Sequence, residues 1–363
     1  MPRRTATMLA STLILIALLC AGVFIQVPYG EMSPGPTVNT LGDHDGEPVL
    51  QVPDDKTHPA KGHLNMTTVR VTSAEYHMNL VEAVYGWLAG DKLVVPRQVL
   101  YPDGQTEEQS NQENAEEFSQ SQESAKVAAL KQLHVKVTTQ TVVAAVQKDS
   151  PAQGRLHAGD VIKAVDGTAV KQPDDVAKLV TKHRPGQSVA FTVVPAKAQE
   201  AAEKSGKNAT GTHRVTVTAG KSPEKDGHAI VGITAGVDHT YPFPIDIKLA
   251  DVGGPSAGLM FALGLYDKLT PGDLTGGEFV AGTGTIDDAG KVGEIGGIGM
   301  KTIGARNQGA RYFLTPEGNC AEAAKNVPDG LTLVKVGTIH DALDALKDIR
   351  EKKTSRLPSC TKG

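Results

Sequence analysis

The residues of this chain best placed to do chemistry are a serine and a lysine, each in its own glycine-rich turn. Ser256 lies in the segment 253–258, Gly-Gly-Pro-Ser-Ala-Gly, directly before a strongly apolar run that predicts a helix. Lys301 follows the segment 296–300, Gly-Gly-Ile-Gly-Met, where a second helix is expected to begin. A serine and a desolvated lysine can together hydrolyse a peptide bond without histidine, metal or nucleotide.

The surroundings of Lys301 favour an amine that is neutral near pH 7. Gly299, Gly304 and Ala305 lie on or near the same face of the predicted helix, so we expect the lysine stem in a cramped apolar place. Burial disfavours the ammonium form and lowers the pKa of a lysine, and the positive end of the helix dipole acts in the same direction. The neutral amine can then take the proton of a serine hydroxyl. The alternative is an ordinary exposed lysine.

The turn around Ser256 is also suited to hold a negative charge. Gly254, followed by Pro255, lets the backbone approach a substrate closely. The amides from Gly254 to Ala257 open a helix, so we expect them to bind the oxyanion of the reaction. The alternative is a serine that only caps the helix.

Other catalytic sets have no pattern of their own. The eleven histidines form no His-Glu-x-x-His and have no cysteine partner at metal-binding spacing, so no metal site is predicted. The residue counts alone do not exclude a catalytic triad of serine, histidine and aspartate. Its candidate histidines are His228, His239 and His340, none of which lies in a motif.

Three segments together resemble the proteolytic domain of Lon: residues 254–258, residues 280–284 (Val-Ala-Gly-Thr-Gly), and the Gly-Gly-Ile that precedes Lys301. The resemblance implies that Ser256 is the nucleophile, that Lys301 is the general base, and that Thr283 supports the lysine amine. Many Lon domains carry an aspartate where this chain has Gly253. No phosphate-binding Gly-x-x-x-x-Gly-Lys-Ser/Thr is present. The nearest segment, 284–292, is expected to form a β-turn, so we predict an ATP-independent enzyme with no nucleotide or other cofactor.

Short β-branched runs between residues 135 and 220 indicate a smaller β-rich unit with one helix, from Pro173 to His183. Its Ser-Pro-Ala (150–152), Gly-Asp-Val-Ile (159–162) and Asp-Gly (166–167) resemble a PDZ domain of the bacterial protease type. The resemblance implies a groove between a strand and the helix that takes an extended peptide as an added strand. The alternative is a spacer domain. The residues expected to line the groove are Thr141, Val142, Val143, Val176 and Leu179.

The N-terminus predicts a membrane segment. Arg3 and Arg4 precede an uncharged stretch from Met8 to Val27, which is long enough to span a bilayer. The basic flank predicts a single-pass protein with a cytoplasmic N-terminus and an extracellular catalytic domain. A cleaved signal peptide is the alternative. In an oxidising exterior, Cys320 and Cys360 are candidates for a disulfide, with two independent thiols as the alternative.

The predicted organisation is therefore multi-domain: a transmembrane helix, a β-rich PDZ-like domain and an α/β (α+β) Lon-type domain. This layout resembles the membrane-attached PDZ–Lon proteases of Gram-positive bacteria. The resemblance implies a serine endopeptidase of the cell envelope that acts on proteins or peptides, with the PDZ domain recruiting or gating the substrate, and it suggests a homo-oligomer. The alternative is an inactive PDZ-containing scaffold.

With 37 basic and 41 acidic residues and no run of like charge, a nucleic-acid partner is not expected. The predicted boundaries are 1–30 for the signal anchor, 31–63 for a linker, 64–134 for a strand and helix segment flanking the PDZ domain, 135–220 for the PDZ domain, 225–348 for the Lon domain and 349–363 for a C-terminal tail.

Overall fold

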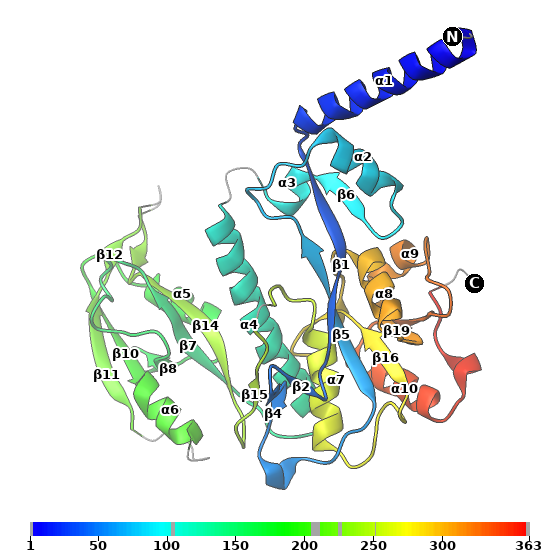
Figure 1. Ribbon diagram of the computed structural model, residues 1–363. Coiled ribbons are helices and arrows are strands. Elements are labelled where there is room, and N and C mark those ends of the chain that lie inside the picture. The colour runs from blue at the N-terminus through cyan, green and yellow to red at the C-terminus, as the bar shows by residue number, and fades with distance from the viewer. Residues whose placement is uncertain (1–2, 103–105, 205–210, 224–226, 251, 361–363) are drawn as a thin grey trace. The chain divides into compact units, whose positions relative to one another are not determined.

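The chain forms two compact units, and the second is inserted into the sequence of the first (Figure 1). A computed structural model describes residues 3–102, 106–204, 211–223, 227–250 and 252–360. Unit 1 comprises residues 1–51, 56–133 and 247–363, whereas unit 2 comprises residues 52–55 and 134–246. The predicted succession of separate domains is corrected here, because residues 31–51 and 64–133 belong to the same unit as the serine and the lysine.

Unit 1 is built on a mixed sheet with helices on both faces. β15 and η1 lie where the chain passes from one unit to the other. In chain order its elements are α1 (Arg3–Phe24), β1 (Tyr29–Asn39), β2 (Asp43–His44), β3 (Glu47–Pro48), β4 (Leu50–Gln51), η1 (Asp54–Lys56), β5 (His63–Val71), α2 (Leu80–Leu88), β6 (Leu93–Pro96), α3 (Arg97–Leu100), α4 (Glu107–Gln132), β15 (Asp246–Ile247), α7 (Gly258–Leu269), β16 (Phe279–Gly282), β17 (Thr285–Ile286), β18 (Val292–Gly293), α8 (Ile298–Asn307), β19 (Tyr312–Pro316), η2 (Glu317–Asn319), α9 (Cys320–Ala323), β20 (Thr332–Val336), α10 (Ile339–Arg350) and η3 (Thr354–Arg356).

The sheet of unit 1 has the strand order β20-β19-β16-β5-β1-β6. Its first four strands are parallel, and β1 is antiparallel to both β5 and β6. Ala281 of β16 packs in one cluster with Ile298 and Ala305 of α8. A Cβ atom on its neighbour Gly282 would lie 2.7 Å from Met260 of α7. Because successive strand residues point to opposite faces, α8 and α7 cover opposite faces, and their N-termini meet beyond the end of β16.

The predicted linker 31–63 is wrong, because it contains most of β1, a strand paired on both edges. The pairing of β1 with β5 is irregular between Pro34 and Thr37. Prolines are tolerated at such a bulge, since no ladder hydrogen bond is required there. A Cβ atom on Gly35 would lie 2.3 Å from Thr68 Oγ1, so the two strands approach closely here. The Pro-Gly-Pro of residues 34–36 thus lies inside the central sheet.

α4 extends through a polar stretch that is rich in Glu, Gln, Asn and Ser. It begins after Thr106, whose hydroxyl accepts from the amide of Gln109 in a capping box; residues 103–105 lie outside the described part of the chain. Phe118 packs edge-on against Phe261 of α7, with ring centroids 5.8 Å apart. This contact seats α4 on the helix that follows Ser256.

Unit 2 is a β-rich body around one core, in which Val176 and Val180 of its main helix pack with Phe191. Its sheet has the strand order β11-β10-β8-β7-β14, with β9 paired to β8. After β10 the chain forms helix α6, whose Ala, Glu, Gln and Lys residues favour helix. Its elements are β7 (Thr138–Val146), β8 (Val161–Val165), β9 (Thr168–Ala169), α5 (Pro173–Val180), β10 (Ser188–Val194), α6 (Ala196–Lys204), β11 (His213–Thr218), β12 (Gly220–Lys221), β13 (Ala229–Ile230) and β14 (Ile233–Thr240).

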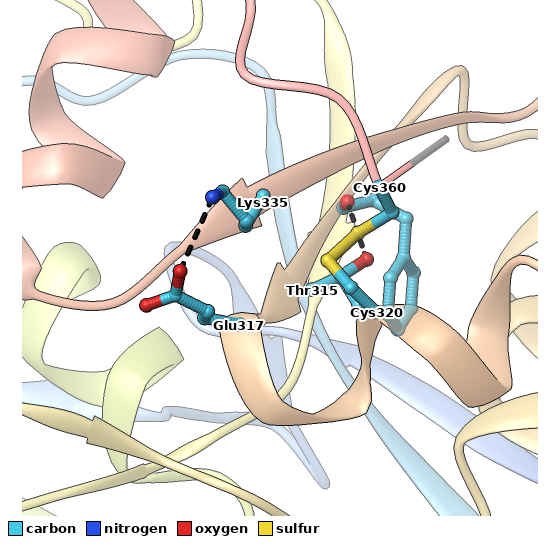
Figure 2. The surroundings of a disulfide bond; sticks show 6 residues. Thr315, Glu317, Cys320, Lys335 and Cys360 are labelled. Carbon is cyan, nitrogen blue, oxygen red and sulfur yellow. Dashed lines mark hydrogen bonds and ion pairs between the residues drawn. A yellow bond between two sulfur atoms is a disulfide. The ribbon is translucent and has the colours of Figure 1, made fainter. Parts of the chain in front are cut away.

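The predicted C-terminal tail 349–363 packs onto unit 1 as far as it is described. The amide of Lys335 in β20 donates to the carbonyl of Pro358 at 2.8 Å. A disulfide joins Cys320 of α9 to Cys360, with their Cα atoms 4.9 Å apart (Figure 2). Both cysteines lie in the hydrophobic core beneath α8, so the bridge fastens the end of the chain to the helix layer that carries Lys301.

Candidate active site

Ser256 and Lys301 lie in direct contact, with Lys301 Nζ 2.7 Å from Ser256 Oγ. The lysine amine also donates to the backbone carbonyl of Thr67 and to Thr283 Oγ1, each at 3.1 Å. A neutral lysine amine has two N–H donors and one lone pair. With both donors directed to Thr67 and Thr283, the lone pair faces the serine hydroxyl, which is the arrangement a general base needs.

Thr283 connects the base to the backbone of the nucleophile. Its hydroxyl donates to the carbonyl of Ser256 at 2.9 Å, so its oxygen is free to accept from Lys301. The amide of Gly284 donates to the same Ser256 carbonyl at 2.9 Å. Ser256 is therefore held from the end of β16 through its backbone, while its side chain is left to the amine.

The electrostatics of the site suit proton transfer near neutral pH. Lys301 is only 2% exposed. Desolvation by this burial lowers the pKa of Lys301 from 10.5 to about 7. Its position in the first turn of α8 acts in the same direction, because the helix N-terminus disfavours a cation.

The turn that carries Ser256 is held from α4. Gly254 adopts a left-handed conformation (φ 79°) and donates its amide to the carbonyl of Asn114 at 2.8 Å. Ser121 Oγ donates to the carbonyl of Pro255 at 2.8 Å. A Cβ atom on Gly258 would lie 2.8 Å from Ser121 Oγ, so a glycine at this position lets α4 approach the turn.

These contacts reduce the number of backbone amides that can donate to the oxyanion. The amide of Gly254 is engaged by Asn114, and Pro255 has no N–H, so Ser256 and Ala257 supply the remaining amides of the predicted set. Ala257, rather than Ser256, occupies the N-cap position of α7, and no side chain caps that helix. A cleft of ≈ 280 Å³ lies beside the turn, between Pro255, residues 285–286 and α4, where Glu117 and Gln120 line it.

Unit 2 carries a groove of its own, with a volume of ≈ 300 Å³. One wall is α5, through Pro173, Val176, Ala177 and Val180, and the other is formed by residues 228–232, which lead into β14, and by Ile233 and Ala235 at its start. β14 stands last in the strand order of its sheet, so among the described strands only β7 pairs with it. The groove thus has an apolar helix on one side and an open strand edge on the other.

The predicted lining of this groove is largely wrong. Thr141, Val142 and Val143 lie on the inner strand β7 and are buried, because β14 occupies the edge they were expected to form. Val176 does line the groove, whereas Leu179 packs against the core of unit 2.

The loop that contains Gly232, directly before the groove strand β14, was not predicted from the sequence. Gly232 has φ 74°, and a Cβ atom there would lie 2.2 Å from Cβ of Ser150, so glycine is required. A glycine between two apolar residues, Val231 and Ile233, directly before a strand was the available signal.

Residues 250–348 match the model of the Lon protease (S16) C-terminal proteolytic domain. Residues 117–203 match the PDZ domain family, a match that begins inside α4 and ends before β14. The chain carries a Lon-type proteolytic domain and a PDZ domain.

Individual relatives agree with this assignment over short stretches. The mitochondrial Lon protease homolog of Yarrowia lipolytica is 34% identical over 96 residues, which are 26% of this chain and 8% of that protein. Lon protease 2 of Bacillus subtilis is 34% identical over 97 residues, 26% of this chain and 17% of that protein. The "Probable periplasmic serine endoprotease DegP-like" of Brucella suis is 45% identical over 53 residues, 14% of this chain and 10% of that protein. The chain thus spans less than a fifth of each relative, and the similarities support a hydrolase of the serine peptidase class.

The three candidate triad histidines of this PDZ–Lon chain each have a described neighbour or lining role of their own. His228 lines the groove of unit 2, His239 contacts Thr139 across two strands of the same unit, and His340 lies 3.5 Å from Asp344 on α10. Within the described residues, no group of three or more His, Cys, Asp or Glu side chains is arranged to hold a metal.

The N-terminal helix has the composition expected of it. Thr7–Phe24 of α1 has a mean hydropathy of 2.3, which fits either a membrane anchor or a signal sequence.

Proposed function

We propose that this protein is an ATP-independent serine endopeptidase of the cell envelope, in which Ser256 is the nucleophile and Lys301 the general base. The observation that carries the proposal is the 2.7 Å contact between Lys301 Nζ and Ser256 Oγ. Thr67 and Thr283 orient the amine so that its lone pair faces the serine. The Lon-type domain match supports the same chemistry.

The reaction follows from this geometry. Lys301 takes the Ser256 hydroxyl proton as Oγ bonds to the scissile carbonyl carbon, and the amides of Ser256 and Ala257 stabilise the oxyanion. The C–N bond then breaks, and the lysine ammonium returns its proton to the leaving amine. In the second half-reaction, Lys301 deprotonates a water that attacks the acyl-enzyme, and the proton passes back to Ser256 Oγ.

Two features support an envelope location with the catalytic unit outside. α1 is long and apolar enough to anchor the chain, with Arg3 and Arg4 on its N-terminal flank. The Cys320–Cys360 disulfide suits an oxidising compartment. No ATPase step is proposed, because the segment 284–292 forms the β17–β18 hairpin with a turn at Asp287–Gly290 rather than a phosphate loop.

The groove of unit 2 is proposed to recruit or gate protein substrates. An extended peptide can add as a strand to the open edge of β14 and place alternate side chains against the apolar wall of α5. Backbone pairing of this kind accepts many sequences, which suits a protease that acts on unfolded chains.

The test uses the full chain in detergent micelles with unfolded casein, and follows fragments by mass spectrometry. Ser256→Ala and Lys301→Ala are each expected to abolish cleavage, and Lys301→Arg should fail as well, because arginine is not deprotonated. The matched controls, Ser119→Ala and Lys325→Ala, change exposed residues of the same types and should cleave as wild type does. Cleavage by Ser256→Ala above about a thousandth of the wild-type rate would contradict the dyad.

An inactive scaffold is the rival function, favoured only by Gly253 in place of the aspartate common in Lon domains. Casein that is retained by the wild-type chain but never cleaved would identify the scaffold.

A further inference from the structure

Helix α2 turns its large apolar side chains outward. Leu88 is 82% exposed, Tyr85 63% and Trp87 53%, and Val84 is exposed beside them. The inward positions are small: Ala83 and Gly86 are the residues of α2 that are buried. A helix at the surface of a globular domain normally places its large apolar residues inward, and a contiguous exposed apolar patch marks a binding surface. We call Val84, Tyr85, Trp87 and Leu88 the α2 face.

Helix α2 begins beside the C-terminal end of α1, the proposed membrane anchor (Figure 1). The amide of Leu80 donates to the carbonyl of Ile25, and the amide of Val27 donates to the carbonyl of Met78, each at 2.9 Å. Within the helices, a Cβ atom on Gly22 would lie 3.0 Å from Val81 Cγ2. Among the residues of α1 whose exposure is described, Gly22 is the one that is buried, so this contact marks where α1 meets the rest of unit 1.

No linker separates the anchor from the catalytic sheet. Four residues connect Phe24, the last residue of α1, to Tyr29, the first of β1. α2 itself is about 14 Å long, at about 1.5 Å per residue. The side chains of α2 are therefore confined to the neighbourhood of the point where α1 would leave the hydrocarbon, in or near an interfacial layer about 5–7 Å thick.

The residue types of the α2 face suit that layer. Trp and Tyr side chains concentrate at membrane interfaces, because each combines an apolar body with a polar tip. Trp87 packs edge-on against Tyr29, with ring centroids 5.3 Å apart, which places a third aromatic residue beside them. Phe24 and Ile25 are also exposed, so the C-terminal end of α1 presents apolar surface as well.

We propose that the α2 face rests in the interfacial layer of the same bilayer that α1 crosses. The proposal rests on the membrane anchoring by α1 proposed above. Its consequence is a two-point attachment: α1 in the hydrocarbon and α2 on its surface hold the catalytic sheet in a set orientation, because α2 packs on β1 and β6 of that sheet.

The chain contains a single tryptophan, Trp87, which makes the test specific. The full chain is reconstituted into phosphatidylcholine–phosphatidylglycerol vesicles, with or without lipids brominated near the headgroup end or near the chain terminus. We expect the fluorescence emission of Trp87 to be blue-shifted in vesicles. Bromines near the headgroup end of the lipid should quench this emission more strongly than bromines near the chain terminus. Acrylamide in the aqueous phase should quench it weakly.

The control moves the tryptophan to the far end of the sheet. The Val71 end of β5 lies near β6 and α2, because Val71 pairs with Met32 of β1, which also pairs with β6. The opposite end of β5 is His63, which pairs with Phe279 of β16. Tyr312 of β19 lies at that opposite end, since it pairs with Val280. The double variant Trp87→Phe/Tyr312→Trp should be quenched by acrylamide and not by brominated lipid.

Each other outcome is decisive. Vesicle flotation that fails to carry the protein overturns the anchoring, and with it this proposal. Flotation with a Trp87 that bromine does not quench overturns the α2 proposal alone. A blue-shifted but unquenched Trp87 indicates that a second copy or another protein covers the face.

Discussion

Lys301 and Thr67 are joined by a hydrogen bond of 3.1 Å from the amine to the backbone carbonyl, although 234 residues separate them in the chain. Thr67 belongs to β5, whose neighbour residue Met66 pairs with Gly282 of β16. A carbonyl on an inner strand is a rigid acceptor, so it preorganises the amine before substrate arrives. The proposed catalytic centre therefore draws residues from both sides of the inserted PDZ unit, and the segment 225–348 alone does not contain it.

The first prediction concerns the pH dependence of cleavage. Burial lowers the pKa of Lys301 to about 7, and only the neutral amine accepts the serine proton. The active form is thus gained as pH rises, and kcat/KM should increase roughly tenfold per unit below pH 7 and level off above about pH 8. Initial rates on casein from below pH 6 to above pH 8, with circular dichroism to confirm folding, measure this dependence. A rate that falls or stays flat across pH 6 to 8 would contradict a neutral lysine base.

The second prediction concerns Thr283, which donates to the Ser256 carbonyl and accepts from Lys301. Thr283→Val keeps the shape but removes the hydroxyl, and should lower kcat/KM by roughly 5- to 150-fold, corresponding to about 1–3 kcal/mol for unsatisfied buried groups. The acidic limb of the pH profile should also move to lower pH, because the charged amine loses an acceptor. Thr283→Ser should retain most activity. A fall in activity without movement of the limb would assign Thr283 a packing role instead.

The third prediction concerns α4. Ser121→Ala removes the hydrogen bond to the Pro255 carbonyl, and should slow the labelling of Ser256 by a fluorophosphonate about fivefold, for about 1 kcal/mol. Ser119→Ala on the exposed face of the same helix is the matched control and should label at the wild-type rate. Equal labelling by all three proteins would show that α4 does not hold the nucleophile turn.

Local features of the site were accessible from the sequence. The turns around Ser256 and Lys301 can be recognised in the sequence by their glycines. Gly254 and Gly297 adopt left-handed backbone conformations, which strongly favour glycine at those positions. The apolar run that forms α7 is long enough to fix its own secondary structure. The structure brings Ser256, Lys301 and Thr283 into one hydrogen-bonded set.

Contacts between distant segments were not accessible. Thr67 acts through a backbone carbonyl, which leaves no constraint on its side-chain type for this role. Asn114 and Ser121 lie in a polar stretch that resembles a solvated helix until α7 is placed against it. Pro34 and Pro36 interrupt the sequence pattern by which β1 could have been recognised as a strand. The groove strand was predicted to be β7 instead of β14, because the strand order in unit 2 does not follow the chain order.

The fourth prediction concerns stability. Asp267 on α7 is buried; its Oδ1 accepts from the amide of Leu274, while Oδ2 has no partner. Desolvation raises the pKa of Asp267 from 3.8 to about 6. The folded state then binds a proton more tightly than the unfolded state, so the free energy of unfolding should fall by about 3 kcal/mol in all as pH rises from about 3 to 7, mostly between about pH 4 and 6, and change no further above that.

Asp267→Asn keeps the acceptor for Leu274 without the charge. It should therefore be more stable than wild type at pH 7 and lose most of this advantage near pH 4.5, as urea denaturation measures. Asp329→Asn, at an exposed position, is the control and should follow the wild-type curve. Parallel curves for Asp267→Asn and wild type would contradict the buried charge.

The fifth prediction tests the groove of unit 2. Ala177 is exposed and lines the groove on α5, whereas its neighbour Lys178 is exposed and does not line it. Ala177→Trp fills the space that an added strand would occupy beside β14, and Lys178→Trp places the same bulk outside it. Ala177→Trp should raise KM for casein roughly tenfold, equivalent to about 1.4 kcal/mol of lost recruitment, and leave the turnover of a short quenched peptide unchanged. Lys178→Trp should behave as wild type does on both substrates. If the two tryptophan variants have the same KM for casein, the groove does not recruit this substrate, and the cleavage step depends on unit 1 alone.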